Sequence, residues 1–109
     1  MAISAQILEA QNEFENRLYI SVASLSFFRE CWLPGIKALG LTWTRLFIPG
    51  VDITVNELPV ILNELKQLKE WASLNLHDVN HDHFIERVNS LIEELPSAFQ
   101  RDDAVVFIG

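Results

Sequence analysis

The sequence predicts a single α+β domain, with a mostly antiparallel sheet of about four strands and two main helices packed on one face. Two stretches in the second half carry apolar residues at three- and four-residue spacing, the period of an amphipathic helix. Alternating apolar residues near the start and a continuous apolar run at the end indicate strands. A length of 109 residues, without a linker or an internal repeat, fits one domain covering residues 1–109.

The N-terminal segment is expected to form a β-hairpin. Apolar and polar residues alternate over roughly residues 2–9, with the two-residue period of a strand. The polar residues 11–17 are expected to form a turn, and the alternation resumes in a second strand at Leu18, Ile20 and Val22. A helix over residues 5–16 is the alternative, because Ala, Gln, Leu and Glu favour helices.

A short apolar helix is expected after the hairpin. Ser24 or Ser26 can cap its N-terminus, because a serine oxygen accepts hydrogen bonds from free backbone N–H groups. Pro34-Gly35 is expected to break this helix, and one further turn is expected to stop at Gly40. Apolar residues cover most of its circumference, which is typical of a buried helix. They are Leu25, Phe27, Phe28, Cys31, Trp32 and Leu33.

Residues 41–48 are rich in β-branched and aromatic side chains, which predicts a third strand. Neither face of this strand is cleanly polar, so we expect either a bulge or aromatic side chains on the outer face. A turn at Pro49-Gly50 leads to residues 51–55, which can return to the sheet.

Two amphipathic helices and a terminal strand complete the predicted fold. The first helix covers about residues 56–75, with Asn56 preferred over Thr54 as N-cap because Pro59 then falls in the first turn. The second covers about residues 82–95, and the apolar run 104–108 is interpreted as a strand buried on both sides. The predicted core is Leu62, Leu65, Leu68, Ile85, Val88, Ile92, Val106 and Ile108.

The charge balance disfavours two classes of partner. Eight basic residues oppose fifteen acidic ones, for a net charge of −7. Nucleic acids and anionic membrane surfaces both attract Lys and Arg, so neither is an expected partner. The single cysteine and the absence of a signal-peptide pattern or of an apolar run of roughly 20 residues favour a cytoplasmic location.

The sequence offers no catalytic motif. The histidine-rich segment from His77 to His83 is the best metal candidate, since imidazole binds zinc, nickel and copper. It lacks the His-Glu-x-x-His spacing, however, and we interpret it as a solvated turn between helices. No nucleophile elbow or phosphate-binding loop is present. We therefore expect no catalytic residue, no metal and no cofactor.

The candidate partner-binding residues are one aromatic side chain and four acids. Trp43 is the nominated apolar anchor, because it flanks Arg45 with Phe47 on one face of the predicted third strand. After Leu76, seven acids oppose two bases, so −5 of the net charge lies there. The nominated acids in this region are Asp78, Asp82, Glu86 and Glu93.

The second half of the chain resembles small bacterial immunity proteins, which neutralise toxins delivered between competing cells. The similarity is carried by the run from Asp52 to Leu65, by the second predicted helix and by the closing residues 105–109. It implies a cytoplasmic inhibitor that binds one toxin domain, and an acidic protein suits the basic nucleases common among such toxins. A small metal-dependent enzyme using residues 77–83 and a self-associating accessory domain are the alternatives.

Overall fold

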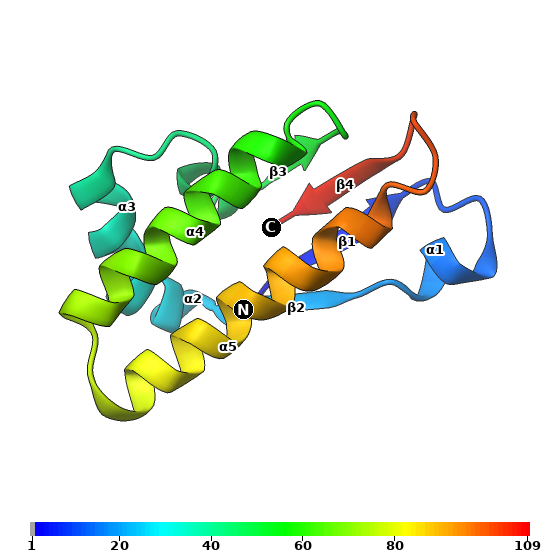
Figure 1. Cartoon of the computed structure of the whole chain (residues 1–109). Helices are drawn as coiled ribbons and strands as arrows, with labels where there is room; N and C mark the ends of the chain where they lie inside the picture. Colours follow the sequence, from blue (N-terminus) through cyan, green and yellow to red (C-terminus); the bar gives the residue numbers. More distant parts are fainter. Residues whose placement is uncertain (1) are drawn as a thin grey trace.

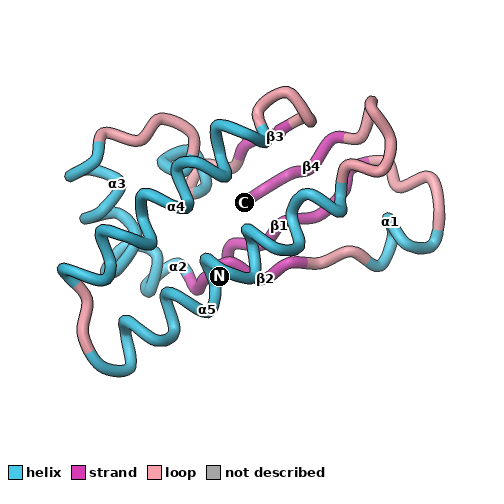
Figure 2. The backbone as a smooth tube through the Cα atoms, in the orientation of Figure 1, coloured by secondary structure: helices cyan, strands magenta, loops and turns pink. Residues whose placement is uncertain are grey.

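The computed structural model describes residues 2–109 and has a four-stranded antiparallel sheet with helices covering one face (Figure 1). The strands lie in the order β2-β1-β4-β3, so the first and last strands of the chain are neighbours in the centre. The two long helices, α4 and α5, pack against each other on that face (Figure 2). The predicted fold class is therefore confirmed.

The N-terminal hairpin is also confirmed. β1 (Ala2–Leu8) pairs antiparallel with β2 (Ile20–Ser24), and the helix considered over residues 5–16 is wrong. Between the pairs Ile3–Ala23 and Ser4–Ser21, β2 contains one extra residue, Val22. This bulge allows both Val22 and Ala23 to be buried, where strict alternation would expose one of them.

The expected turn over residues 11–17 contains a short helix instead, α1 (Glu13–Arg17). Asn12 caps it, because its side-chain oxygen accepts a hydrogen bond from the Glu15 backbone N–H at 2.8 Å. Two charged residues one turn apart, Glu13 and Arg17, form an exposed ion pair. The polar residues 13–17 thus form a short helix that is exposed except at Glu15.

The predicted apolar helix is longer than expected. Ser24 caps α2 (Leu25–Phe27), which continues through a π-helical turn η1 (Phe28–Trp32) into α3 (Leu33–Leu39). The expected break at Pro34-Gly35 is wrong, because the helix widens into a π-helical turn directly before Pro34, in which the Leu33 backbone N–H donates to Phe28 O, and α3 continues from there. α3 ends at Gly40, as predicted, in a left-handed conformation with φ 65°.

The predicted strand over residues 41–48 is wrong. Residues 44–47 form a 3₁₀ turn, η2 (Thr44–Phe47), and the backbone N–H groups of its N-cap Trp43 and of Thr44 donate to the buried carboxylate of Glu64. Trp43 is half-buried and Phe47 is fully buried, so they do not share an exposed strand face with Arg45. Strand structure resumes, as expected, at β3 (Val51–Ile53).

The two long helices are confirmed with shifted starts. α4 (Leu58–Asn75) begins at the N-cap Glu57 rather than Asn56, and the Glu57 carboxylate accepts hydrogen bonds from the backbone and hydroxyl of Thr54. Pro59 lies in its first turn, as predicted. α5 (Asp78–Glu94) begins four residues earlier than expected and runs into the 3₁₀ turn η3 (Leu95–Ala98).

The C-terminal strand β4 (Val105–Ile108) pairs with both β1 and β3. It is not buried on both sides as expected, because the helices cover one face of the sheet only. Val106 and Ile108 are fully buried on that face, whereas Phe107 is 37% exposed on the other. The Phe107 ring lies over Gly50, which has φ 101° and no space for a Cβ.

The core agrees largely with the predicted set. Five of its members are fully buried: Leu65, Leu68, Val88, Val106 and Ile108. Three others, Leu62, Ile85 and Ile92, are partly buried and pack at its margin. Among residues 2–109, no helix is both long and apolar enough to cross a membrane.

Candidate functional site

The outward side of α5 carries three of the nominated acids. Asp82, Glu86 and Glu93 are exposed and lie four and seven residues apart, a spacing that places them on one flank of the helix. The opposite side is buried against the sheet and α4 through Phe84, Val88 and Leu91.

The charge of α5 is unbalanced. Its seventeen residues include five acids (Asp78, Asp82, Glu86, Glu93 and Glu94) and one base (Arg87), for a net charge of −4 with neutral histidines. α4 packs beside it and carries two acids and two bases, for a net charge of zero. Of the two long helices, only α5 therefore carries a net negative charge.

The other two nominated residues lie elsewhere. Asp78 is exposed in the first turn of α5, where a carboxylate stabilises the positive end of the helix dipole. Trp43 belongs to the segment between α3 and β3, and its backbone N–H donates to Glu64 of α4 at 3.1 Å. The predicted set is thus divided among the flank of α5, its N-terminus and the segment packed on α4.

The histidine segment is helical, which corrects its interpretation as a turn. His77 occupies the N-cap position of α5, and the next six residues form its first turns. His81 Nδ1 lies 3.2 Å from Asp82 Oδ1, and the His83 ring meets Phe27 edge-on at 4.7 Å between ring centroids. Residues 2–109 contain no group of three or more His, Cys, Asp or Glu side chains arranged to hold a metal ion.

One charged cluster was not found from the sequence. The Glu15 side chain is fully buried, and both of its oxygens accept from the Arg101 guanidinium, at 2.7 and 3.0 Å. Glu15 also accepts from the backbone N–H of Gln11 at 2.8 Å, and Arg101 donates to Asp103 at 2.8 Å. The cluster joins α1 to the loop before β4 across 86 positions of sequence, and no local pattern indicates such a pairing.

Hydrogen bonds set the ionisation of this cluster. The bonds from Arg101 and from the Gln11 backbone hold the pKa of Glu15 below its ordinary value, against an opposing effect of burial. The same pairing raises the pKa of Arg101. Both groups therefore stay charged at neutral pH, and the ion pair is a structural link between the two loops.

Acidification is expected to weaken this link. Because the pKa of Glu15 lies below its ordinary value in the folded chain, its contribution to stability is present above that ordinary value and is lost as the pH falls through the folded pKa. Glu15→Gln should therefore be less stable than the parent at pH 7, and the difference should shrink below the ordinary glutamate pKa. Urea unfolding at several pH values from 7 downwards measures it.

Glu13→Gln is the matched control, because Glu13 lies in the same helix but its side chain is 74% exposed. Its unfolding midpoint should follow that of the parent across the same pH range. A Glu15→Gln variant whose deficit stays constant from neutral to acidic pH would contradict the role assigned to the charge.

The lone cysteine is not a candidate nucleophile. Cys31 is buried in the π-helical turn, and burial, with a smaller effect from the charge of Glu30, raises the pKa of its thiol. Since the thiolate is the reactive form, this environment favours an unreactive side chain.

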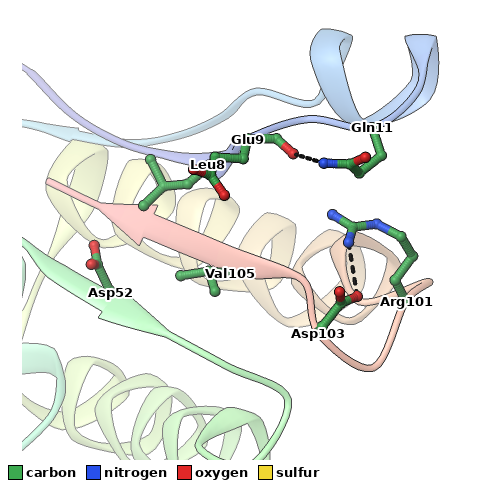
Figure 3. Close-up of a pocket in the computed structure, with 7 residues that line it drawn as sticks. All are labelled: Leu8, Glu9, Gln11, Asp52, Arg101, Asp103 and Val105. Carbon is green, nitrogen blue, oxygen red and sulfur yellow. Dashed lines mark hydrogen bonds and ion pairs between the residues drawn. The ribbon is translucent and has the colours of Figure 1, made fainter.

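A hollow of about 440 Å³ lies next to the Glu15–Arg101 cluster (Figure 3). Leu8 of β1 and Val105 of β4 contribute its apolar surface, while the polar side chains stand around it. These polar residues are Glu9, Gln11, Asp52, Arg101 and Asp103. Glu9 has φ 50°, a left-handed conformation that is uncommon outside glycine.

Comparisons with known proteins identified no relative of this chain. No family model matches the chain, and neither a curated protein nor a solved structure matches it.

Proposed function

We propose that this chain is a protein-binding inhibitor without catalytic activity, and that it contacts a basic partner through the outward flank of α5. The observation that carries the proposal is the net charge of −4 on this one helix, three of whose acids lie exposed on a single flank. A surface that carries charge of one sign attracts a partner of opposite charge and repels proteins of like charge.

The acids of this flank are available for binding because the fold does not require them. Glu86 and Glu93 are exposed, and the side chain of Asp82, whose Oδ1 lies 3.2 Å from His81 Nδ1, is 84% exposed. Exposed charges contribute little to folding, so replacing them should change binding without unfolding the domain.

The resemblance to immunity proteins supports a more specific form of the proposal. An immunity protein is a small cytoplasmic inhibitor that covers a toxin domain, and such toxins are often basic nucleases. A compact acidic domain suits that task, because opposite charge accelerates encounter between inhibitor and toxin. The proposed partner is accordingly a basic toxin domain.

Charge reversal on α5 tests the proposal. Asp82→Lys with Glu86→Lys should slow association with the partner by about tenfold or more in roughly 0.01 M salt. The effect should largely disappear in roughly 1 M salt, where the Debye length falls from about 30 Å to about 3 Å. The partner is first recovered by co-purification from the native host, and association rates are then measured by stopped flow at both salt concentrations.

A second double variant, Glu30→Lys with Glu70→Lys, controls for net charge. It changes the total charge by the same amount at two exposed positions outside α5, so its effect on association should be clearly smaller. Equal slowing by both variants would show that association depends on the total charge of the protein and not on the position of the acids. Unchanged association rates for the α5 variant would show that this flank is not part of the interface.

A further inference from the structure

The face of the sheet opposite the helices is uncovered and partly apolar. In the paired strands, Gln6 of β1 lies opposite Phe107 of β4, which lies opposite Asp52 of β3. Leu8 lies opposite Val105 in the same way. Leu8 is 40% exposed and Phe107 is 37% exposed, so this face presents apolar side chains to solvent at the centre of the sheet.

The hollow at one end of this face is strongly acidic. Counting the buried Glu15 behind it, the hollow has four carboxylates (Glu9, Glu15, Asp52 and Asp103) and one guanidinium, that of Arg101, for a net charge of −3. Arg101 is already bonded to Glu15 and Asp103. Within residues 2–109, Glu9 and Asp52 have no ion-pair partner.

This arrangement selects a particular kind of occupant. An anion is disfavoured, because the one cationic group is already bonded to two carboxylates and two further carboxylates line the hollow. A small metal ion is disfavoured too, since these carboxylates do not converge on a common point. Figure 3 shows Asp52, Glu9 and Asp103 standing apart around the rim, with Leu8 and Val105 between them. A cationic head group on an apolar stem fits both features.

We infer that the uncovered face of the sheet is a second docking surface, which binds a basic segment of another protein and seats one of its Arg or Lys side chains in the hollow. The stem of that side chain lies along Leu8 and Val105, and its charge lies among Glu9, Asp52 and Asp103. This surface is on the opposite side of the sheet from α5, so it binds independently of the flank proposed above.

Titration of the ¹⁵N-labelled protein with the peptide acetyl-Val-Arg-Val-Arg-Val-amide tests the inference by NMR. Saturable shifts are expected at the amides of Leu8, Glu9, Asp52 and Val105. The same peptide with citrulline in place of arginine should not bind, because it keeps the shape and loses the charge. Glu9→Gln with Asp52→Asn should weaken binding by about tenfold, which corresponds to 1.4 kcal/mol.

The Asp82→Lys, Glu86→Lys variant separates this inference from the proposed function. It should bind the peptide like the parent, because α5 is not part of the sheet face. Shifts confined to α5, or equal binding of the citrulline peptide, would overturn the inference. Both Glu9 and Asp52 are exposed, so their replacement should leave the dispersion of the spectrum, and hence the fold, intact.

Discussion

Leu65→Ala is expected to lower the free energy of unfolding by about 2–5 kcal/mol. Leu65 lies on the buried side of α4 and is fully buried. Truncation removes apolar surface from the core and leaves a cavity, because the neighbouring side chains can collapse only partly. Urea unfolding followed by tryptophan fluorescence measures the loss.

Leu74→Ala is the matched control, since Leu74 has the same side chain in the same helix but is 82% exposed. Its loss should stay below about 1 kcal/mol, as is usual for surface positions. Similar losses for the two variants would place Leu65 outside the core.

Glu64→Ala is expected to cost about 2–4 kcal/mol, because it leaves buried donors without an acceptor. Glu64 is 4% exposed, and its Oε1 accepts from the backbone and hydroxyl of Thr44 at 2.8 and 2.9 Å. Its Oε2 accepts from the backbone N–H of Trp43 at 3.1 Å. Thr44 is fully buried, so water cannot replace the lost acceptor without disturbing the turn.

Two further variants identify the source of that loss. Glu64→Gln keeps one carbonyl oxygen and should fall between the parent and Glu64→Ala. Glu70→Ala removes an exposed carboxylate from the same helix and should change stability by less than about 0.5 kcal/mol. If Glu64→Ala matched Glu70→Ala, the carboxylate would have no part in holding η2 on α4.

Local sequence patterns were sufficient to predict much of the fold. The three- and four-residue periodicity located α4 and α5, because a helix must bury one stripe of its surface whatever the rest of the chain does. The alternation of apolar and polar residues located β1 and β2, because a strand that buries one face must bury every second side chain. Gly40 was predicted as a helix end and Ser24 as one of two candidate N-caps, because such preferences depend on local backbone geometry. The exposed acids of α5 followed from spacing alone.

Other features were decided by contacts between residues far apart in sequence. Residues 41–48 have strand-like composition, yet Glu64, about twenty positions away, binds their backbone N–H groups and holds them in a 3₁₀ turn. Trp43 therefore does not lie on the strand face that was predicted for it. The Glu15–Arg101 pair depends on a partner 86 positions distant and has no local signature.

Composition and short repeating patterns were enough to predict the class of the fold, the two long helices, the terminal strands and the acidic charge of α5. Two features depend instead on how the chain folds in three dimensions: one face of the sheet is uncovered, and Glu9, Asp52 and Asp103 line a common hollow. Those side chains come from three separate segments, and their proximity results from strand order and loop packing.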